Sequence, residues 1–155
     1  MNRRKQQKGF VLIAMSVTLV LLFGMIGLAF DLGRVYIARN EAQVFTDAAS
    51  MAAAKELDGS VAGLQRARDA VAKLPNRWNL GTEDFSGVVV EFSDSIGPGA
   101  RWQRAPRSAG DILYARVTAP DNHLSMTFLR AVGSPESITV PARSVAAIEP
   151  VRLVQ

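Results

Sequence analysis

An uncharged run over residues 9–30 constrains the fold of this chain more than any other feature. The run is about 22 residues long, or roughly 33 Å as an α-helix, which is enough to cross the hydrocarbon core of a bilayer. Its only polar side chains are those of Ser16 and Thr18, whose hydroxyls can bond back to the helix. We therefore expect residues 9–30 to form a transmembrane helix.

The tail that precedes this run, residues 1–8, is strongly basic. It contains four cations and no acid: Arg3, Arg4, Lys5 and Lys8. The positive-inside rule keeps such a tail in the cytoplasm and sends everything after residue 30 outward. The other 14 of the 18 Lys and Arg residues balance the 14 Asp and Glu residues, so the net charge of +4 reports membrane orientation and excludes a nucleic-acid-binding role.

A removable secretory signal is the alternative interpretation of the same run. Signal h-regions span about 7–15 residues and end at a cleavage site with two small residues. Gly27-Leu-Ala29 resembles such a site, but Phe30 and Asp31 follow it in a pattern that continues the helix. We favour a retained anchor, followed by about 125 residues that suffice for one external domain.

The helical pattern continues well beyond the apolar run. Apolar and small residues recur at alternating steps of three and four, the spacing of an a/d seam. No Pro or Gly interrupts residues 34–57, and Gly59 is a natural stop. We predict one helix over residues 9–57, roughly 70 Å long, in which residues 31–58 project from the membrane. The seam comprises Gly24, Leu28, Asp31, Val35, Ala38, Ala42, Phe45, Ala49 and Ala52, with Arg34 one turn after Asp31.

Small seam residues allow close packing of helix backbones, and two partners are conceivable. The outer half could pack on the chain's own C-terminal domain, or on helices of other subunits. A seam that crosses the membrane boundary favours some use of the second. Asp31 and Arg34 could likewise form an i,i+3 ion pair or face a neighbouring helix near the headgroups. Asp47 lies off the seam, and we expect it to be solvent-exposed.

Residues 59–155 predict a small α+β head. Ser60 can cap a second helix that ends before Pro75. Beyond it, alternation and turn residues predict strands over residues 87–92, 111–118 and 137 to about 148, with a short helix over residues 125–132. The expected fold is therefore pilin-like: one long helix, a second helix and an antiparallel sheet of about three strands.

The sequence contains few side chains that could support catalysis. It has no cysteine, and its single histidine, His123, lies in a turn-like sequence. No Gly-rich phosphate loop and no Gly-x-Ser-x-Gly motif is present. We therefore expect a non-enzymatic protein without metal or cofactor. Arg101, Arg104 and Arg107 surround Trp102 and could bind a phosphate or an acidic surface, although a solvated loop is the simpler interpretation.

The polar positions of the long helix form a specific pattern. After the basic tail and Gly9 it reads Asp31-Leu-Gly-Arg34-Val-Tyr36, Arg39, Ala42-Gln43, Thr46-Asp47-Ala-Ala49 and the alanine-rich residues 51–54. This pattern resembles the N-terminal segment of the TadE/TadG-like proteins of tight-adherence (Tad, or Flp) pilus assembly. A weaker likeness lies in Phe128-Leu129, Gly133 and the strand to Ala147.

The resemblance implies a component or accessory of a bacterial pilus machine. It would be a single-pass protein of the inner membrane with its head in the periplasm, and its partners would be pilin-like subunits or further copies of itself. Related prepilins are cut after a glycine, which makes Gly9-Phe10 a candidate processing site. Five residues after Gly9, however, the usual acidic residue is replaced by Ala14.

The missing carboxylate favours an unprocessed, TadG-like minor pilin or assembly factor. Two alternatives remain open at this point. The chain could be a processed pseudopilin that enters the filament, or a ligand-binding module on a membrane stalk with the arginine-rich loop as its site.

Overall fold

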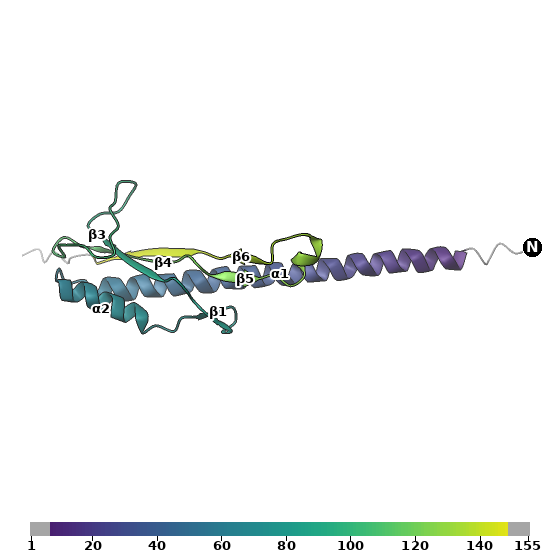
Figure 1. Cartoon of the computed structure of the whole chain (residues 1–155), viewed down its shortest axis with the longest axis horizontal. Helices are drawn as coiled ribbons and strands as arrows, with labels where there is room; N and C mark the ends of the chain where they lie inside the picture. The colour runs from purple at the N-terminus through teal and green to yellow at the C-terminus, as the bar shows by residue number, and fades with distance from the viewer. Residues whose placement is uncertain (1–6, 149–155) are drawn as a thin grey trace, which may run out of the picture.

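The computed structural model describes residues 7–148, with a head packed along the C-terminal half of one long helix (Figure 1). This helix, α1, spans Gln7–Lys55 without a break over 49 residues. It confirms the predicted continuous helix to within two residues at each end. The predicted cytoplasmic tail falls mostly outside the described residues, and so does the stretch beyond Ile148.

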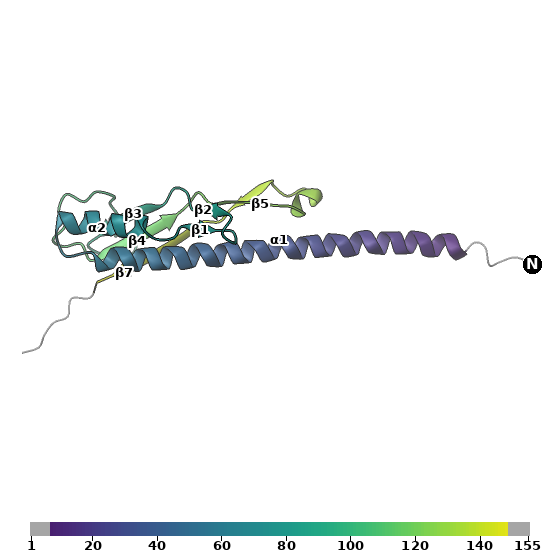
Figure 2. The ribbon, with the colours of Figure 1, turned by 90° about the horizontal axis from the view of Figure 1, so that it is seen from below.

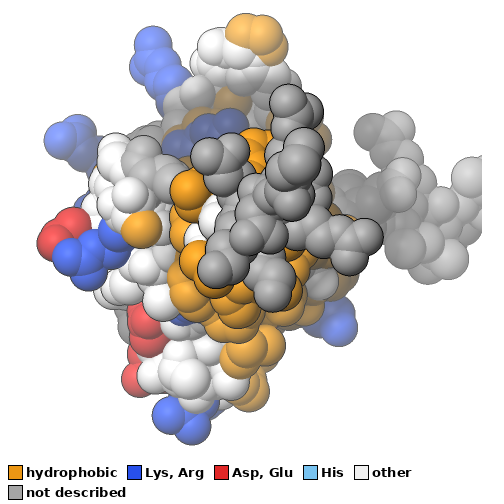
Figure 3. Space-filling model, turned by 90° about the vertical axis from the view of Figure 1, so that its right-hand side faces the viewer, with side chains coloured by type: hydrophobic (Ala, Val, Ile, Leu, Met, Phe, Trp, Pro, Cys, Tyr) orange, Lys and Arg blue, Asp and Glu red, His pale blue; other side chains and the backbone are white. Residues whose placement is uncertain are grey.

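Residues 9–26 of α1 extend beyond the head and are exposed (Figure 2). Within residues 7–148, α1 is long and apolar enough to cross a membrane, with a mean hydropathy of 2.6 over its most apolar stretch, which is almost entirely exposed. The hydroxyls of Ser16 and Thr18 donate to backbone carbonyls four residues earlier, at 2.9 Å each, as predicted. Seen from this end, hydrophobic side chains surround the helix and charged ones lie further out (Figure 3).

The head is built from one helix, one main sheet and two short ribbons, which confirms the α+β prediction. Helix α2 spans Val61–Ala72. The main sheet is antiparallel in the order β3-β4-β7, with β3 at Val89–Ser93, β4 at Tyr114–Ala119 and β7 at Ala142–Ala147. One ribbon pairs β1 (Arg77–Trp78) with β2 (Glu83–Asp84), and the other pairs β5 (His123–Ser125) with β6 (Ser137–Thr139).

Two elements of the C-terminal region differ from their predictions. The single strand expected from residue 137 to about 148 is divided into β6 and β7, because Pro141 lacks an N–H and interrupts the ladder. The prediction of a short helix over residues 125–132 is wrong. Ser125 ends β5, and only the 3₁₀ turn η1 (Leu129–Val132) is helical. The Leu129 N–H binds Asp31 and the Ser125 carbonyl accepts from Arg34, so the first hydrogen bond of such a helix is not formed.

The core lies between the C-terminal half of α1 and the head. Ala38, Ala42 and Ala49 are fully buried there, and their short side chains let the sheet lie close to the helix axis. Larger side chains fill the space nearer to α2 and β1. Phe45 stacks on Phe85 at 4.5 Å between ring centroids, and Phe85 stacks on the buried Trp78 at 5.6 Å.

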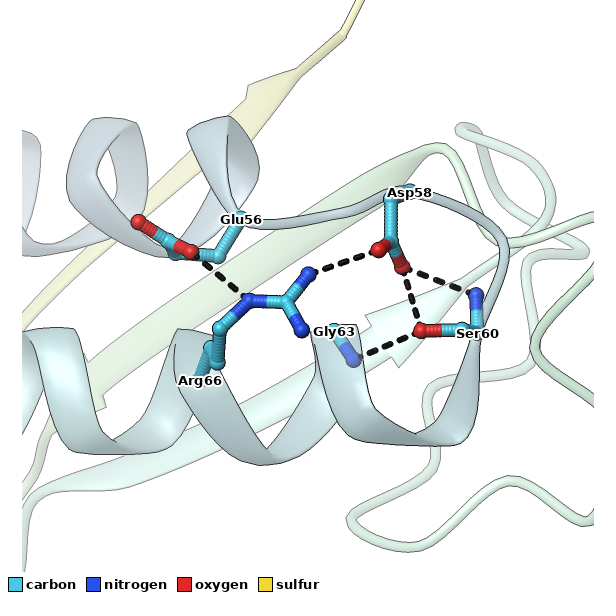
Figure 4. Close-up of polar contacts among 5 residues, drawn as sticks. All are labelled: Glu56, Asp58, Ser60, Gly63 and Arg66. Atoms are coloured by element: carbon cyan, nitrogen blue, oxygen red, sulfur yellow. Dashed lines mark hydrogen bonds and ion pairs between the residues drawn. The ribbon is translucent and has the colours of Figure 1, made fainter.

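The corner between α1 and α2 is closed by a polar network (Figure 4). Ser60 is the N-cap of α2, as predicted, and its Oγ accepts a hydrogen bond from the Gly63 N–H at 2.9 Å. The Ser60 hydroxyl donates to the Asp58 carboxylate at 2.6 Å, and the Arg66 guanidinium donates to the same carboxylate at 2.6 Å. Arg66 also contacts Glu56 at 3.1 Å, so one guanidinium links both sides of the corner.

Replacing Ser60 by alanine should lower the free energy of unfolding by about 1 kcal/mol, because the Gly63 N–H loses its acceptor. The measurement is urea unfolding of the full chain in detergent micelles, followed by Trp fluorescence. Ser108→Ala, at an exposed position, is the matched control and should leave the midpoint unchanged. Equal midpoints for both variants would contradict a stabilising cap.

Candidate functional site

Asp31 is a completely buried carboxylate at the C-terminal end of the apolar run of α1. One of its oxygens, Oδ2, accepts hydrogen bonds from the Phe128 and Leu129 N–H groups, at 2.7 Å each. The Thr127 N–H is 3.2 Å from both carboxylate oxygens. Asp31 therefore caps the turn η1 from a position almost 100 residues earlier in the chain, and satisfies N–H groups that the turn cannot satisfy itself.

Arg34, one turn after Asp31, secures the same part of the head. Its guanidinium donates to the Ser125 carbonyl at 3.0 Å and to the Thr127 hydroxyl at 3.4 Å. Its second Nη donates to the Asn79 side-chain oxygen at 3.3 Å, and so reaches the β1–β2 ribbon. We call residues 126–134, which Asp31 and Arg34 hold against α1, the tip loop.

The environment of Asp31 keeps its carboxylate ionised. Burial raises the pKa of Asp31, but the N–H donors of Leu129, Phe128 and Thr127 act against it, and the nearby Arg34 adds a further lowering. The net result is a pKa below the ordinary value of 3.8. The charged form is thus the one that binds the tip loop.

Neither interpretation of Asp31 and Arg34 drawn from the sequence describes these contacts. Among the ion pairs of residues 7–148, none joins Asp31 to Arg34. Both side chains bind the head of their own chain. One signal in the sequence pointed to these contacts, namely the weaker resemblance of Phe128-Leu129 to TadE/TadG-like proteins. These are the residues whose N–H groups donate to Asp31.

A second polar contact fastens β7 to α1 further from the apolar run. The Gln43 amide donates to the Ser144 hydroxyl at 2.9 Å, and the Thr46 hydroxyl lies 3.1 Å from it. Ser144 donates to the Asp47 carboxylate, which also accepts from Gln43 at 2.9 Å. Asp47 is exposed, as expected, but it is more than a solvated charge because it anchors a strand.

The predicted seam divides into two parts. Four of its members in the outer half are buried against the chain's own head: Ala38, Ala42, Phe45 and Ala49. Asp31 is buried beneath the tip loop, while Val35 and Ala52 are half-buried. The two seam members within the apolar run differ: Gly24 is exposed and Leu28 is half-buried. The candidate processing residues Gly9 and Phe10 are exposed at the beginning of the helix. The intramolecular interpretation therefore describes the packing of the outer seam.

Gly27 is a contact residue that the seam pattern missed. A Cβ on Gly27 would lie 2.7 Å from the Cβ and Cγ of Phe128, so only glycine leaves room for this aromatic side chain. The Phe128 ring also meets Phe30 edge-on, at 5.7 Å between centroids. The tip loop thus reaches back over the last turn of the apolar run.

The arginine-rich loop does not form a convergent site. Arg101, Arg104 and Arg107 are all exposed. Arg104 borders a cavity of about 450 Å³ between α2 and β3, whereas Arg107 borders a separate one of about 220 Å³. Trp102 packs against the guanidinium of Arg116, at 4.3 Å, and not among the three arginines.

His123 and the acidic residues offer no metal site in the described part of the chain. The His123 ring is exposed and lies 3.4 Å from the Thr139 hydroxyl. No group of three or more His, Asp or Glu side chains within residues 7–148 is arranged to hold a metal ion.

The side chains of α1 that bind the head, from Asp31 to Asp47, all lie within a segment that matches a known family. Residues 9–56 match the Tad family, described as Flp pilus-assembly TadE/G-like. The chain carries a TadE/G-like segment. This segment is about a third of the chain and ends one residue after α1, so it includes Asp31, Arg34 and Asp47 but none of their partners in the head. No curated protein and no solved structure matches the chain significantly.

Acidification should weaken the head's attachment to α1. The pKa of Asp31 lies below 3.8 in the folded chain, and the hydrogen bonds from Ser60 and Arg66 lower the pKa of Asp58 to about 2. A carboxylate whose pKa is lower in the folded chain than in the unfolded chain stabilises the fold fully at any pH above its unfolded-state pKa. This contribution is lost as the pH falls through its folded-state pKa. The free energy of unfolding in detergent should therefore decrease between about pH 4 and pH 2.

The measurement is urea unfolding of the full chain at a series of pH values. Asp58→Asn is the internal comparison, because its stability should depend less on pH over this interval. A free energy of unfolding that rises on acidification would contradict the assignment.

Proposed function

We propose that this protein is a non-enzymatic, membrane-anchored minor pilin or assembly factor of a Tad/Flp-type pilus, of the TadG-like kind. The observation that carries the proposal is the division of α1. The head packs on one face of its outer half and reaches back to Gly27, whereas residues 9–26, within the TadE/G-like segment, are exposed and extend beyond the head. These exposed residues form the surface that remains for the inner membrane and for pilin-like partners.

The two groups of hydrogen bonds between α1 and the head restrict the movement of the head. Asp31 and Arg34 hold the head at one end of the outer half of α1, and Gln43, Thr46 and Asp47 hold β7 further along. Because the head is attached at two levels, it cannot rotate freely about the helix. Lateral packing of the apolar halves in lipid would thereby set the relative positions of the heads in the periplasm.

Gly24 offers the sharpest test of packing in lipid. A Cβ at Gly24 meets nothing within 4 Å in the single chain, so Gly24→Leu should leave the fold intact while blocking close approach of another helix. We expect cross-linking to pilin-like subunits in native cells to fall severalfold. Gly33→Leu is the matched control, because Gly33 is equally unobstructed but lies off the seam. Unchanged cross-linking with Gly24→Leu would count against helix packing as the mechanism.

The processed pseudopilin is the second candidate, supported by the exposed Gly9-Phe10 bond position at the start of α1. The N-terminal mass of the protein from native cells, with and without the prepilin peptidase, separates the two. An intact basic tail in both strains would support a membrane-resident assembly factor. A chain that begins at Phe10 only when the peptidase is present would establish a filament-competent pseudopilin despite Ala14.

The ligand-binding module is tested by replacing Arg101, Arg104 and Arg107 together with alanine. An assembly factor that acts through its helix should support normal piliation with this triple variant, because the three side chains are exposed and do not converge. Loss of piliation with a correctly folded head would favour the ligand-binding alternative.

A further inference from the structure

The tip loop lies at the end of the head nearest to the part of α1 that extends beyond the head (Figures 1 and 2). Its Phe128 side chain contacts Gly27 and Phe30, which both belong to the apolar run. At a rise of 1.5 Å per residue, Gly27 lies about 4.5 Å inside the end of that run. If residues 9–30 cross a bilayer, Phe128 therefore lies at the depth of the outer boundary between headgroups and acyl chains.

The side chains of the tip loop suit this depth. Phe128 is 47% exposed although it packs on α1, and its neighbour Phe30 is 53% exposed. Within residues 126–132 the sequence contains one charged side chain, the exposed Arg130, which pairs with Glu136 at 2.7 Å. Exposed Phe side chains with Arg nearby occur in segments that lie in the interface of a membrane.

The backbone of the tip loop is also prepared for a medium with little water. Unsatisfied N–H groups are costly near hydrocarbon. Asp31 accepts those of residues 127–129, and internal bonds occupy the N–H groups of Ala131, Gly133 and Ser134, at 3.0–3.2 Å. The buried carboxylate thus satisfies three N–H groups of this loop that would otherwise be costly to bring near lipid.

We propose that the tip loop inserts Phe128 into the outer headgroup–acyl boundary of the membrane that α1 crosses. The head then contacts the bilayer at a second point beside the helix, which fixes its height and its rotational orientation on the membrane surface. The inference rests on the proposed function, because it requires residues 9–30 to span a bilayer. We infer that lipid is what contacts the tip loop. Contact of the loop with a neighbouring subunit is the alternative that the test below distinguishes.

The absence of cysteine from the sequence makes site-directed fluorescence labelling direct. Single-cysteine variants of the full chain, labelled with an environment-sensitive fluorophore, are reconstituted in vesicles of phosphatidylcholine and phosphatidylglycerol. Phe128→Cys and Ala131→Cys report on the tip loop, and the second keeps the Phe128 ring in place. Leu21→Cys reports on the predicted span, and Ile96→Cys reports on an exposed apolar residue of the head far from the tip loop. Quenching by nitroxide-labelled lipid chains is compared with quenching by iodide in the water.

Both tip-loop labels should be quenched severalfold more strongly by the lipid nitroxide than the label at residue 96. Preferential iodide quenching at residues 128 and 131, with lipid quenching at residue 21, would overturn the inference while leaving the span intact. Protection from both quenchers would show that protein covers the loop, and would overturn it in favour of a subunit contact. Absence of lipid quenching at residue 21 would instead refute the membrane span and the proposed function with it.

Discussion

Replacing Asp31 by alanine should release the tip loop from α1 and reduce the free energy that holds this end of the head by about 2–4 kcal/mol. The reason is the loss of one acceptor shared by three N–H groups, those of residues 127–129. Removing one partner of a buried hydrogen bond leaves the other without its bond and without water, and this costs more than the bond contributes on average. The loop would then be held by Arg34, through Ser125 and Thr127, and by the packing of Phe128 on α1.

Hydrogen–deuterium exchange of the full chain in detergent micelles measures this loss locally. Amides of residues 123–134 should exchange faster in Asp31→Ala by a factor of tens to about a thousand, while those of α2 and the main sheet should change little. Asp31→Asn keeps one carbonyl acceptor and should lose less protection. Asp111→Asn, at an exposed position, is the control for the carboxylate itself. Wild-type exchange in Asp31→Ala would show that the tip loop does not depend on this carboxylate.

Combining Ala42→Leu with Ala49→Leu should detach the main sheet from α1. Both alanines are 0% exposed against the head, and each substitution adds three carbon atoms where the sheet lies close to the helix. Overpacking of this kind costs about 1–3 kcal/mol per site, so the pair should lower the free energy of unfolding by about 2–6 kcal/mol. Limited proteolysis in micelles should cleave residues 59–148 of the double variant much faster than those of the wild type.

Ala48→Leu is the matched control for this pair, because Ala48 lies on an exposed face of the same stretch of α1. It should be as resistant to protease as the wild-type chain. A double variant that resists protease equally well would show that the sheet is not seated closely on these alanines.

The position of these alanines also changes how a loss of pili is interpreted. If the outer seam packed on other subunits, loss of pili with Ala42→Leu and Ala49→Leu would be evidence for that packing. Because both residues lie beneath the chain's own head, the same defect now follows from misfolding of a single molecule. Gly24, which has no neighbour in the chain, remains informative about contacts between subunits.

The family pattern acquires a physical meaning from the same contacts. Asp31, Arg34, Gln43, Thr46 and Asp47 are polar positions of the TadE/G-like segment, and each bonds to the C-terminal half of the head or helps to orient a group that does. Two of these partner groups, in the tip loop and in β7, belong to the region where the weaker likeness was found. In this chain, these five polar positions therefore serve to attach the head to α1.

Local sequence determined the elements whose signals are local. The unbroken helix, its apolar half, the Ser60 cap and the approximate positions of α2, β3 and β4 all follow from hydrophobic period, chain length and the identities of a few terminal residues. Strands of two or three residues, such as β1, β2 and β5, are too short to show a period, so they were missed. Pro141 indicated a break in the last strand. Because apolar and polar residues alternate on both sides of Pro141, the sequence nevertheless predicted one strand instead of β6 and β7.

Only the tertiary structure decided which surfaces meet. A seam of small residues favours close approach of any backbone, and its spacing is the same whether the partner is another helix or the chain's own sheet. The partner of Asp31 lies almost 100 residues away along the chain, in a loop whose N–H groups donate to that carboxylate. Such contacts arise from the folding of distant segments onto one another, and no local periodicity in the sequence encodes them.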